Sequence, residues 1–160
     1  MFLKTYQRLI DLPLSSSPLN HVTTMDLLDP FLKVKTSTLP RCGKGLFTKA
    51  FIPKGSFITE YKGKISTWKD ADHNEGNNLY IYFVSRNHVI DANGKKDDFA
   101  HFANDARGIT KVTGVLNNSQ YVVKKKCVYI QATKNIEAGS EILVGYGKDY
   151  WDVIKKNGVM

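Results

Sequence analysis

One tyrosine of the sequence, Tyr146, stands between two glycines directly after an apolar, strand-like run. Because neither neighbour carries a side chain, the Tyr146 hydroxyl is sterically unshielded and can reach into a binding site. The same pattern also fits a tyrosine that closes a β-corner. The sequence therefore marks Tyr146 as a candidate functional residue and leaves both interpretations open.

A set of aromatic residues in the middle of the chain could surround a substrate. Phenol hydroxyls orient an amine by hydrogen bonds, and the faces of aromatic rings attract a cation. Each ring taken singly is also typical of a half-buried strand residue that packs in a core. The set consists of Tyr61, Tyr80, Tyr82, Phe83, Phe99 and Phe102.

Two short stretches could bind a ligand through the backbone or through an amide group. Gly43-Lys44-Gly45 frees the chain to turn sharply and present N–H and C=O groups, although an ordinary β-turn explains it more simply. Asn104-Asp105 favours a turn, and an Asn amide matches the donor–acceptor edge of adenine. His101 nearby is more typical of a boundary histidine than of a catalyst. No phosphate-binding glycine loop, nucleophile–base arrangement or metal-ligand spacing stands out in the sequence.

Short strands, separated by turns that contain Gly, Pro or Asn, are the elements that must position these residues. Strands are predicted at residues 31–36, 57–61, 79–84, 112–116, 121–123, 128–132 and 142–144. Short helices are predicted at residues 67–72 and 97–102. The pattern is typical of a compact, mainly β domain.

The chain of 160 residues is long enough for one domain with its own hydrophobic core. We expect an N-terminal extension over residues 1–30, the domain over residues 31–152 and a tail over residues 153–160. The apolar runs are far shorter than the roughly 20 residues of a membrane-spanning helix, and no secretory leader is expected. Two cysteines cannot build a disulfide framework, which favours a reducing intracellular compartment.

The net charge of +8 suggests an acidic partner such as nucleic acid. The charge is uneven: residues 41–70 carry seven basic and two acidic residues, whereas residues 71–100 carry three basic and five acidic ones. The basic segment could contact nucleic acid, and the acidic one could face a basic peptide. An unevenly charged, solvated surface is the simpler interpretation.

Read in order, these stretches resemble the SET domain, the fold of protein lysine methyltransferases that use S-adenosylmethionine. The resemblance covers about residues 31–152. It implies a β-clip of short strands and small sheets with a pseudoknot-like C-terminal segment, as in compact stand-alone viral and protist SET proteins. The stretches that carry it are Gly43-Lys44-Gly45-Leu46-Phe47, Glu60-Tyr61-Lys62-Gly63, Tyr80-Ile81-Tyr82-Phe83, Ile90-Asp91-Ala92, Phe102-Ala103-Asn104-Asp105, Asn118 and Ile136 to Tyr146-Gly147.

The sequence departs from the family pattern at two places in the site. Asp105 stands where the family has a histidine, although the family's backbone contacts to adenine need no imidazole. Val144 stands where the family has a tyrosine or phenylalanine, so mono-, di- or trimethylation cannot be assigned. The cysteine-rich flanks of many SET domains are absent, so the resemblance implies no metal.

The resemblance also implies roles for individual residues. Tyr146 would place its hydroxyl beside the sulfonium and the methyl group, as the catalytic residue. Trp151 would cover the adenine, and the substrate peptide would add as a strand near residues 77–84. The lysine channel would be lined by Tyr61, Tyr80 and Tyr82. The cofactor S-adenosyl-L-methionine would be held by Lys44, Gly45, Leu46, Asn104, Asp105, Tyr146 and Trp151.

The activity implied is transfer of methyl groups to a protein lysine, on a basic protein or peptide such as a histone tail. A lysine of a non-histone protein would be indistinguishable in sequence terms. The alternative is a catalytically inactive SET-like module that binds a basic peptide or nucleic acid. The expected compartment is the nucleus or cytoplasm, of a host cell if the protein is viral. The sequence leaves the oligomeric state open, with a dimer as one possibility.

Overall fold

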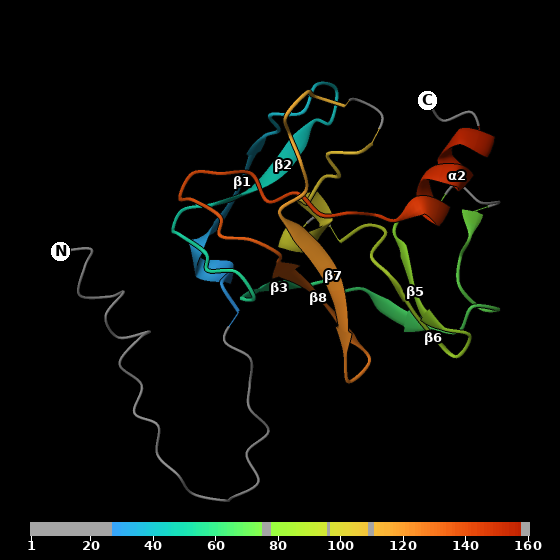
Figure 1. Ribbon diagram of the computed structural model, residues 1–160. Helices are drawn as coiled ribbons and strands as arrows, with labels where there is room; N and C mark the ends of the chain where they lie inside the picture. The colour runs from blue at the N-terminus through green and yellow to red at the C-terminus, as the bar shows by residue number, and fades with distance from the viewer. Residues whose placement is uncertain (1–26, 75–77, 96, 109–110, 158–160) are drawn as a thin grey trace, which may run out of the picture.

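Short antiparallel strands make up most of the computed structural model, which describes residues 27–74, 78–95, 97–108 and 111–157 (Figure 1). The strands are β1 (Leu32–Thr36), β2 (Lys44–Thr48), β3 (Phe57–Glu60), β4 (Lys64–Ser66), β5 (Ile81–Ser85), β6 (His88–Asp91), β7 (Ser119–Lys124) and β8 (Cys127–Ala132). The helical elements are the 3₁₀ turns η1 (Asp29–Phe31) and η3 (Phe99–Phe102) and the α-helix α2 (Lys148–Lys156). The mainly β fold expected from the sequence is confirmed.

Three small sheets arise from this order: β1-β2, β3-β8-β7 and β4-β6-β5, all antiparallel. β8 shows why the sequence folds this way, because Val128, Ile130 and Ala132 alternate with less buried residues and point into the core. The β7–β8 turn has Lys125 and Lys126 at positive φ, the geometry of a tight two-residue hairpin.

A segment near the C-terminus, residues 141–144, runs between three parts of the chain that are distant in sequence. It forms isolated bridges from Glu141 to Phe47, from Leu143 to Asn104 and from Val144 to Ser119. The Asn118 side chain clamps this segment, since its Nδ2 donates to the carbonyl of Glu141 at 2.7 Å and its Oδ1 accepts from the N–H of Leu143 at 2.8 Å. The expected pseudoknot-like arrangement is therefore present, although residues 142–144 form bridges instead of a continuous strand.

Several expected elements differ in the structure. Residues 112–116 form no strand, because Gly114 turns the chain at φ +81°. Residues 67–72 form turns in place of a helix, and residues 97–102 are helical only as η3. The strands β2, β4 and β6 were not predicted.

Helix α2 is the largest element that the sequence did not predict. It crosses the expected boundary after residue 152 and buries Ile154 against the domain. Lys148 and Asp152 form an i,i+4 ion pair on its exposed face. In Figure 1, α2 lies above β5 and β6, and residues of α2 line the same pocket as Tyr82 and Phe83 of β5.

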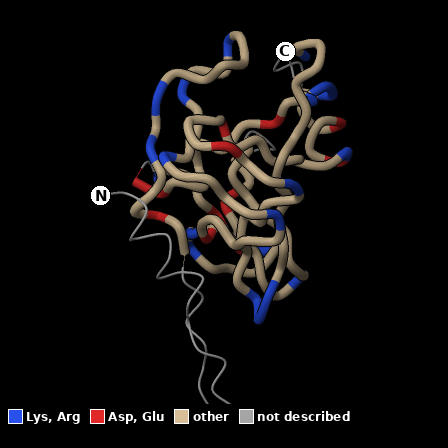
Figure 2. Tube along the Cα trace, turned by 60° about the vertical axis from the view of Figure 1, so that its left-hand side comes forward, with Lys and Arg blue, Asp and Glu red and all other residues tan. Residues whose placement is uncertain are grey.

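Figure 2 shows the basic residues at several separate places on the chain, including the β7–β8 turn with Lys124, Lys125 and Lys126.

Among the described helices, none has the length and apolar character needed to cross a membrane. Within the same residues, no group of three metal-binding side chains gathers. Residues 1–26 of the expected N-terminal extension lie outside the described part.

Candidate active site

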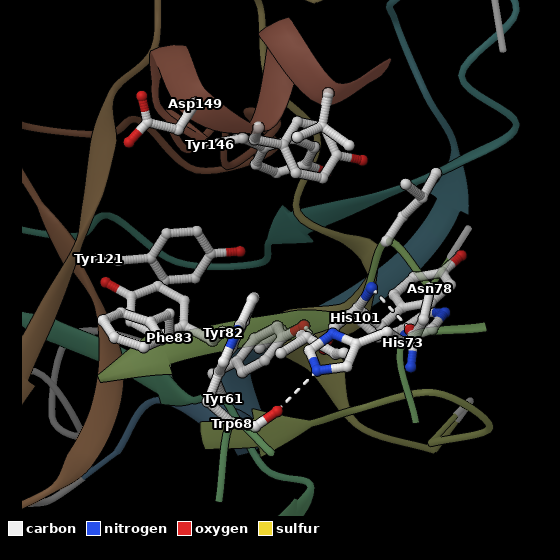
Figure 3. A pocket seen from close by; sticks show the side chains of 16 residues that line it. Tyr61, Trp68, His73, Asn78, Tyr82, Phe83, His101, Tyr121, Tyr146 and Asp149 are labelled. Carbon is white, nitrogen blue, oxygen red and sulfur yellow. Dashed lines mark hydrogen bonds between the residues drawn. The ribbon is translucent and has the colours of Figure 1, made fainter. Parts of the chain in front are cut away.

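A cavity of about 740 Å³ is lined mainly by aromatic rings (Figure 3). Elements far apart in sequence supply them: Tyr61 directly follows β3, Tyr82 lies on β5, Tyr121 on β7 and Tyr150 in the first turn of α2. In Figure 3, Tyr146 and Asp149 lie on one side of the cavity, opposite Tyr61, Tyr82 and Trp68. The lining tyrosines are Tyr61, Tyr80, Tyr82, Tyr121, Tyr146 and Tyr150.

Three of these rings pack against one another and form one wall of the cavity. The centroids of Tyr61 and Tyr121 lie 5.7 Å apart, those of Tyr82 and Tyr121 5.1 Å, and those of Tyr61 and Tyr82 6.0 Å. These are edge-on and tilted contacts of the kind that aromatic pairs prefer. The Tyr61 hydroxyl also donates to the carbonyl of Tyr80 at 2.8 Å, which ties this wall to the chain leading into β5. The wall is thus held in place before any ligand binds.

Tyr146 is fixed at both its hydroxyl and its backbone. Its hydroxyl donates to the carbonyl of Ala103 at 2.8 Å, and its N–H donates to Asp105 Oδ2 at 2.9 Å. Its ring is stacked with Trp151, 5.8 Å between centroids and 13° between planes, and meets Tyr150 edge-on at 4.8 Å. The ring therefore has one well-defined position at the inner end of the cavity.

Asp105, which stands where the resemblance predicts a histidine, is the centre of a buried hydrogen-bond network. Only 5% of its surface is exposed. Oδ1 accepts from the N–H of Arg107 and from Asn117 Nδ2, both at 2.8 Å. Oδ2 accepts from the N–H of Tyr146 and from Trp151 Nε1, both at 2.9 Å. One carboxylate thus joins the loop after η3 to Tyr146 and to α2.

Glu141, the first residue of the segment 141–144, is the centre of a second hydrogen-bond network. It is 6% exposed. Its carboxylate accepts from Ser37 Oγ and the N–H of Thr38, each at 2.7 Å, and from Asn104 Nδ2 at 3.3 Å. Asn104 Nδ2 also donates to the carbonyl of Lys44 at 3.0 Å. This network holds Asn104 beside the start of β2.

Gly45 cannot carry a side chain, because the Glu141 carboxylate occupies the space. A Cβ on Gly45 would lie 2.1 Å from Glu141 Oε1, closer than any real contact. Gly45 lies within β2 and not in a turn, and the turn is made by Gly43 at φ +64°. Leu46 next to it is fully buried in the core, so only its backbone could meet a ligand.

Replacing Glu141 by Gln is expected to destabilise the protein. Several of the donors on Glu141 come from different segments, and an amide can accept only through one oxygen while its NH₂ faces another donor. We expect a loss of about 2 kcal/mol, or a fall in Tm of about 5 °C. Thermal unfolding followed by circular dichroism measures it, with exposed Glu137→Gln as the matched control. Equal Tm values for the two variants would contradict this role of Glu141.

Burial raises the pKa of several tyrosines of the cavity. Desolvation is the largest cause for Tyr146 and Tyr121, whose phenol pKa values lie well above the ordinary value, and neighbouring phenols add to it. The same cause raises the pKa of Tyr150 to about 12 and also raises that of Tyr61 and Tyr82. These phenols therefore hold their protons to higher pH than an exposed tyrosine does.

These shifts predict loss of stability at alkaline pH. In the unfolded chain a tyrosine loses its proton near pH 10, whereas the buried phenols of the folded protein hold it to higher pH. Folding stability is thus complete below about pH 10 and falls as the pH rises above it. The loss of stability is measured as the change in the unfolding midpoint at a series of pH values from about 8 to about 11, with Tyr121→Phe as the comparison. Tyrosinate absorbance that develops fully near pH 10 in a protein that stays folded would contradict the prediction.

The structure brings the predicted site residues together in two adjoining groups. Tyr61, Tyr80, Tyr82 and Tyr146 line the cavity. The second group connects to it through Tyr146 and contains Lys44, Gly45, Asn104, Asp105 and Trp151. Leu46 is the predicted residue whose side chain lies away from both, in the core.

Several residues of the cavity were not assigned a role by sequence reasoning, among them Tyr121, Tyr150 and His101. Tyr121 is the single aromatic residue of β7, so no local pattern indicated its role. Tyr150 lies in the first turn of α2, a helix that the sequence did not predict. His101 lines the cavity with its ring stacked on Tyr80, 4.4 Å between centroids, which is more than the boundary position expected of it.

The family of the chain follows from comparison with known proteins. The model of the SET domain matches residues 43–147, which is more than half of the chain. The chain therefore belongs to the SET-domain family, as the resemblance of its motifs implied. It is also similar to the histone-lysine N-methyltransferase EZH2 of Chaetomium thermophilum, with 28% identity over 130 residues. That alignment covers 75% of this chain and 8% of the relative, so the chain spans a small part of that protein's length.

Proposed function

We propose that the protein transfers methyl groups from S-adenosylmethionine to a lysine side chain of a protein. The observation that carries this proposal is the cavity of six tyrosines with Tyr146 fixed at its inner end by Ala103 and Asp105. Neutral phenols and ring faces form the kind of channel that can hold and orient an alkylamine. Membership of the SET-domain family supports the same activity.

The charge of the lining also suits a lysine. The chain is rich in Lys and Arg, yet among the described residues none of them lines the cavity. Asp149, at the start of α2, is the lining carboxylate. A lysine ammonium that enters would meet ring faces and one carboxylate, and no positive charge among the described lining residues.

The reacting amine must be neutral, and the cavity supports its deprotonation. A free lysine has a pKa of about 10.4, so deprotonation at pH 7 costs about 4.6 kcal/mol. Burial among aromatic rings disfavours the ammonium form and lowers this cost. The packed wall of Tyr61, Tyr82 and Tyr121 then restricts the direction from which the amine can attack, which is the orientational part of catalysis.

The second group of residues fits the cofactor that the family implies. S-adenosylmethionine supplies an electrophilic methyl group on sulfur. Trp151 is half-buried, held by Asp105 and close to Gly108, where a Cβ would lie 2.5 Å from its ring, so it offers a flat surface for the adenine. Asn104 offers its amide group, and the exposed Lys44 offers a cation for the cofactor's carboxylate. Tyr146 connects this group to the cavity.

We propose a basic peptide, with a histone tail first among the candidates, as the substrate. β5 pairs with β6 on one side, and no strand of the described chain pairs with its other edge, which borders the cavity. A peptide can add there as a further strand and place its lysine among the tyrosines. The name of the relative, a histone-lysine methyltransferase, supports the choice of histones.

The experiment that tests the proposal is incubation with S-adenosylmethionine and core histones, free and as nucleosomes, read by intact-mass spectrometry. A mass gain in steps of one CH₂ on one histone would support both the activity and the substrate. Cofactor binding in calorimetry without any gain would favour another protein substrate. If the experiments show no mass gain and no cofactor binding, the enzyme is rejected and a module that binds basic peptides or nucleic acid is favoured. Steep salt dependence of DNA binding would then identify a nucleic-acid-binding module.

A further inference from the structure

The outer part of the cavity is an exposed apolar surface. Trp68 is 46% exposed, Phe83 52% and Val153 46%, and all three line the cavity. Single exposed apolar residues are ordinary on a protein surface, but several gathered at one cavity mark a binding surface. The tyrosines of the inner part do not need this outer surface in order to hold an amine. It therefore has a different ligand group to bind.

The two successive residues Tyr82 and Phe83 divide the cavity into two sides. They lie on β5, where neighbouring side chains point to opposite faces of the sheet. Tyr82 meets Tyr121 on the inner face at 5.1 Å, whereas Phe83 meets Trp68 on the other face, edge-on at 5.4 Å. The cavity thus extends around the unpaired edge of β5, with phenols on one face and the Trp68–Phe83 pair on the other.

Trp68 is held in place while half of its surface is left open. Its backbone N–H donates to the carbonyl of Arg86 at 2.8 Å, and His73 Nε2 lies 2.7 Å from its backbone carbonyl oxygen. The ring of His73 packs against the indole edge-on, with 4.4 Å between centroids. Because its backbone is tied down and its ring packs against His73, the indole loses little conformational freedom when a ligand packs on it. Trp68 and Phe83 therefore form a preorganised apolar subsite.

We propose that the substrate carries a large apolar side chain directly beside the target lysine, and that Trp68 and Phe83 bind it. The inference rests on the proposed function, since it takes the lysine to lie among the tyrosines on the face of Tyr82. In a peptide strand added to β5, the residue next to that lysine points to the opposite face and reaches Phe83. The apolar subsite and the phenol channel are thus spaced for adjacent residues of one peptide.

The test compares peptides that have one lysine and differ only at its two neighbouring positions. Leu, Ala or Asp is placed first before and then after the lysine, and kcat/KM is measured with the full chain and S-adenosylmethionine. At one of the two positions, we expect the peptide with Leu to have a kcat/KM about tenfold higher than the peptide with Ala, and the peptide with Asp to have a lower kcat/KM than the peptide with Ala. In Phe83→Ala the Leu-to-Ala ratio is expected to fall below about threefold.

Leu116→Ala is the matched control, because Leu116 is a large apolar residue, 62% exposed, that does not line the cavity. It is expected to keep the full Leu-to-Ala ratio. Trp68→Ala replaces Phe83→Ala if circular dichroism shows that the latter does not fold. A ratio near one in the unmodified chain, or a ratio unchanged in the Phe83 and Trp68 variants, overturns the subsite.

Binding of the same peptides, measured by fluorescence anisotropy, separates this inference from the proposed function. If no peptide is methylated but Leu peptides bind about tenfold more tightly than Ala peptides, the subsite stands and the transferase is rejected. If neither methylation nor binding distinguishes Leu from Ala, the subsite is rejected. Methylation without any preference rejects the subsite alone and leaves the transferase in place.

Discussion

Replacing Tyr146 by Phe is expected to lower the rate of methyl transfer by about 100-fold, the usual effect of removing one positioned polar group from an active site. The hydroxyl that is lost is the one held by the carbonyl of Ala103. Its removal frees that carbonyl and takes away the polar group at the inner end of the cavity. Transfer of a labelled methyl group to a peptide, at saturating cofactor, measures the rate.

The fold should survive this change. The Phe ring keeps the stacked contact with Trp151 and the edge contact with Tyr150, and one hydrogen bond is worth about 1 kcal/mol. Tyr129→Phe is the matched control, because Tyr129 lies on β8 against Phe57 and does not line the cavity. Full activity of Tyr146→Phe, with Tm within a few degrees of the unmodified chain, would refute the role of the hydroxyl.

Replacing Asp105 by Ala is expected to cost about 3 kcal/mol or more of folding stability and most of the activity. The change leaves four N–H donors without their acceptor, among them the N–H of Tyr146 and Nε1 of Trp151. For a chain of this size the fall in Tm is about 10 °C. Thermal unfolding measures the stability. The rate of methyl transfer, measured well below the new Tm, shows whether the folded variant still holds Tyr146 in its position.

Two further variants show what the carboxylate itself contributes. Asp105→Asn has nearly the same shape, but its NH₂ must face donors, so it should lose about half of the stability that Asp105→Ala loses. Asp105→His restores the residue that the family pattern has here, yet an imidazole can accept at most one hydrogen bond. If Asp105→His is as stable and active as the unmodified chain, the four-bond network is not what positions Tyr146. Asp152→Ala, at an exposed position of α2, is the control.

The sequence predicts those parts of the fold that local patterns specify. The alternation in β8 and the aromatic run of β5 are visible in the residues themselves, and both strands form close to the expected positions. β2 was missed because Gly45 suggested a turn. The reason for a glycine at position 45 lies almost 100 positions away, because the carboxylate of Glu141 occupies the space that a side chain would need.

The candidate site divides in the same way. The tyrosines at positions 61, 80, 82 and 146 are identified by their type and by the order of the motifs around them, and all four line one cavity. The network of Asp105 has no such signal, since its donors come from positions 107, 117, 146 and 151. Four of the nine residues of helix α2 are apolar or aromatic, but the helix depends on the burial of Ile154 against the domain and on Tyr146, which lies outside the helix.

The threaded segment at residues 141–144 determines the order in which the protein can be completed. It is bridged to Phe47, Asn104 and Ser119, and its Glu141 bonds to Ser37 across 104 positions. Such distant contacts are formed late and slowly, because long loops must close first. A nascent chain can pair β1 with β2 or β7 with β8 as soon as each hairpin has emerged. It cannot hold Tyr146 in place until residues 141–144 have been made and enclosed, so Tyr146 reaches its final position only after nearly all of the chain has folded.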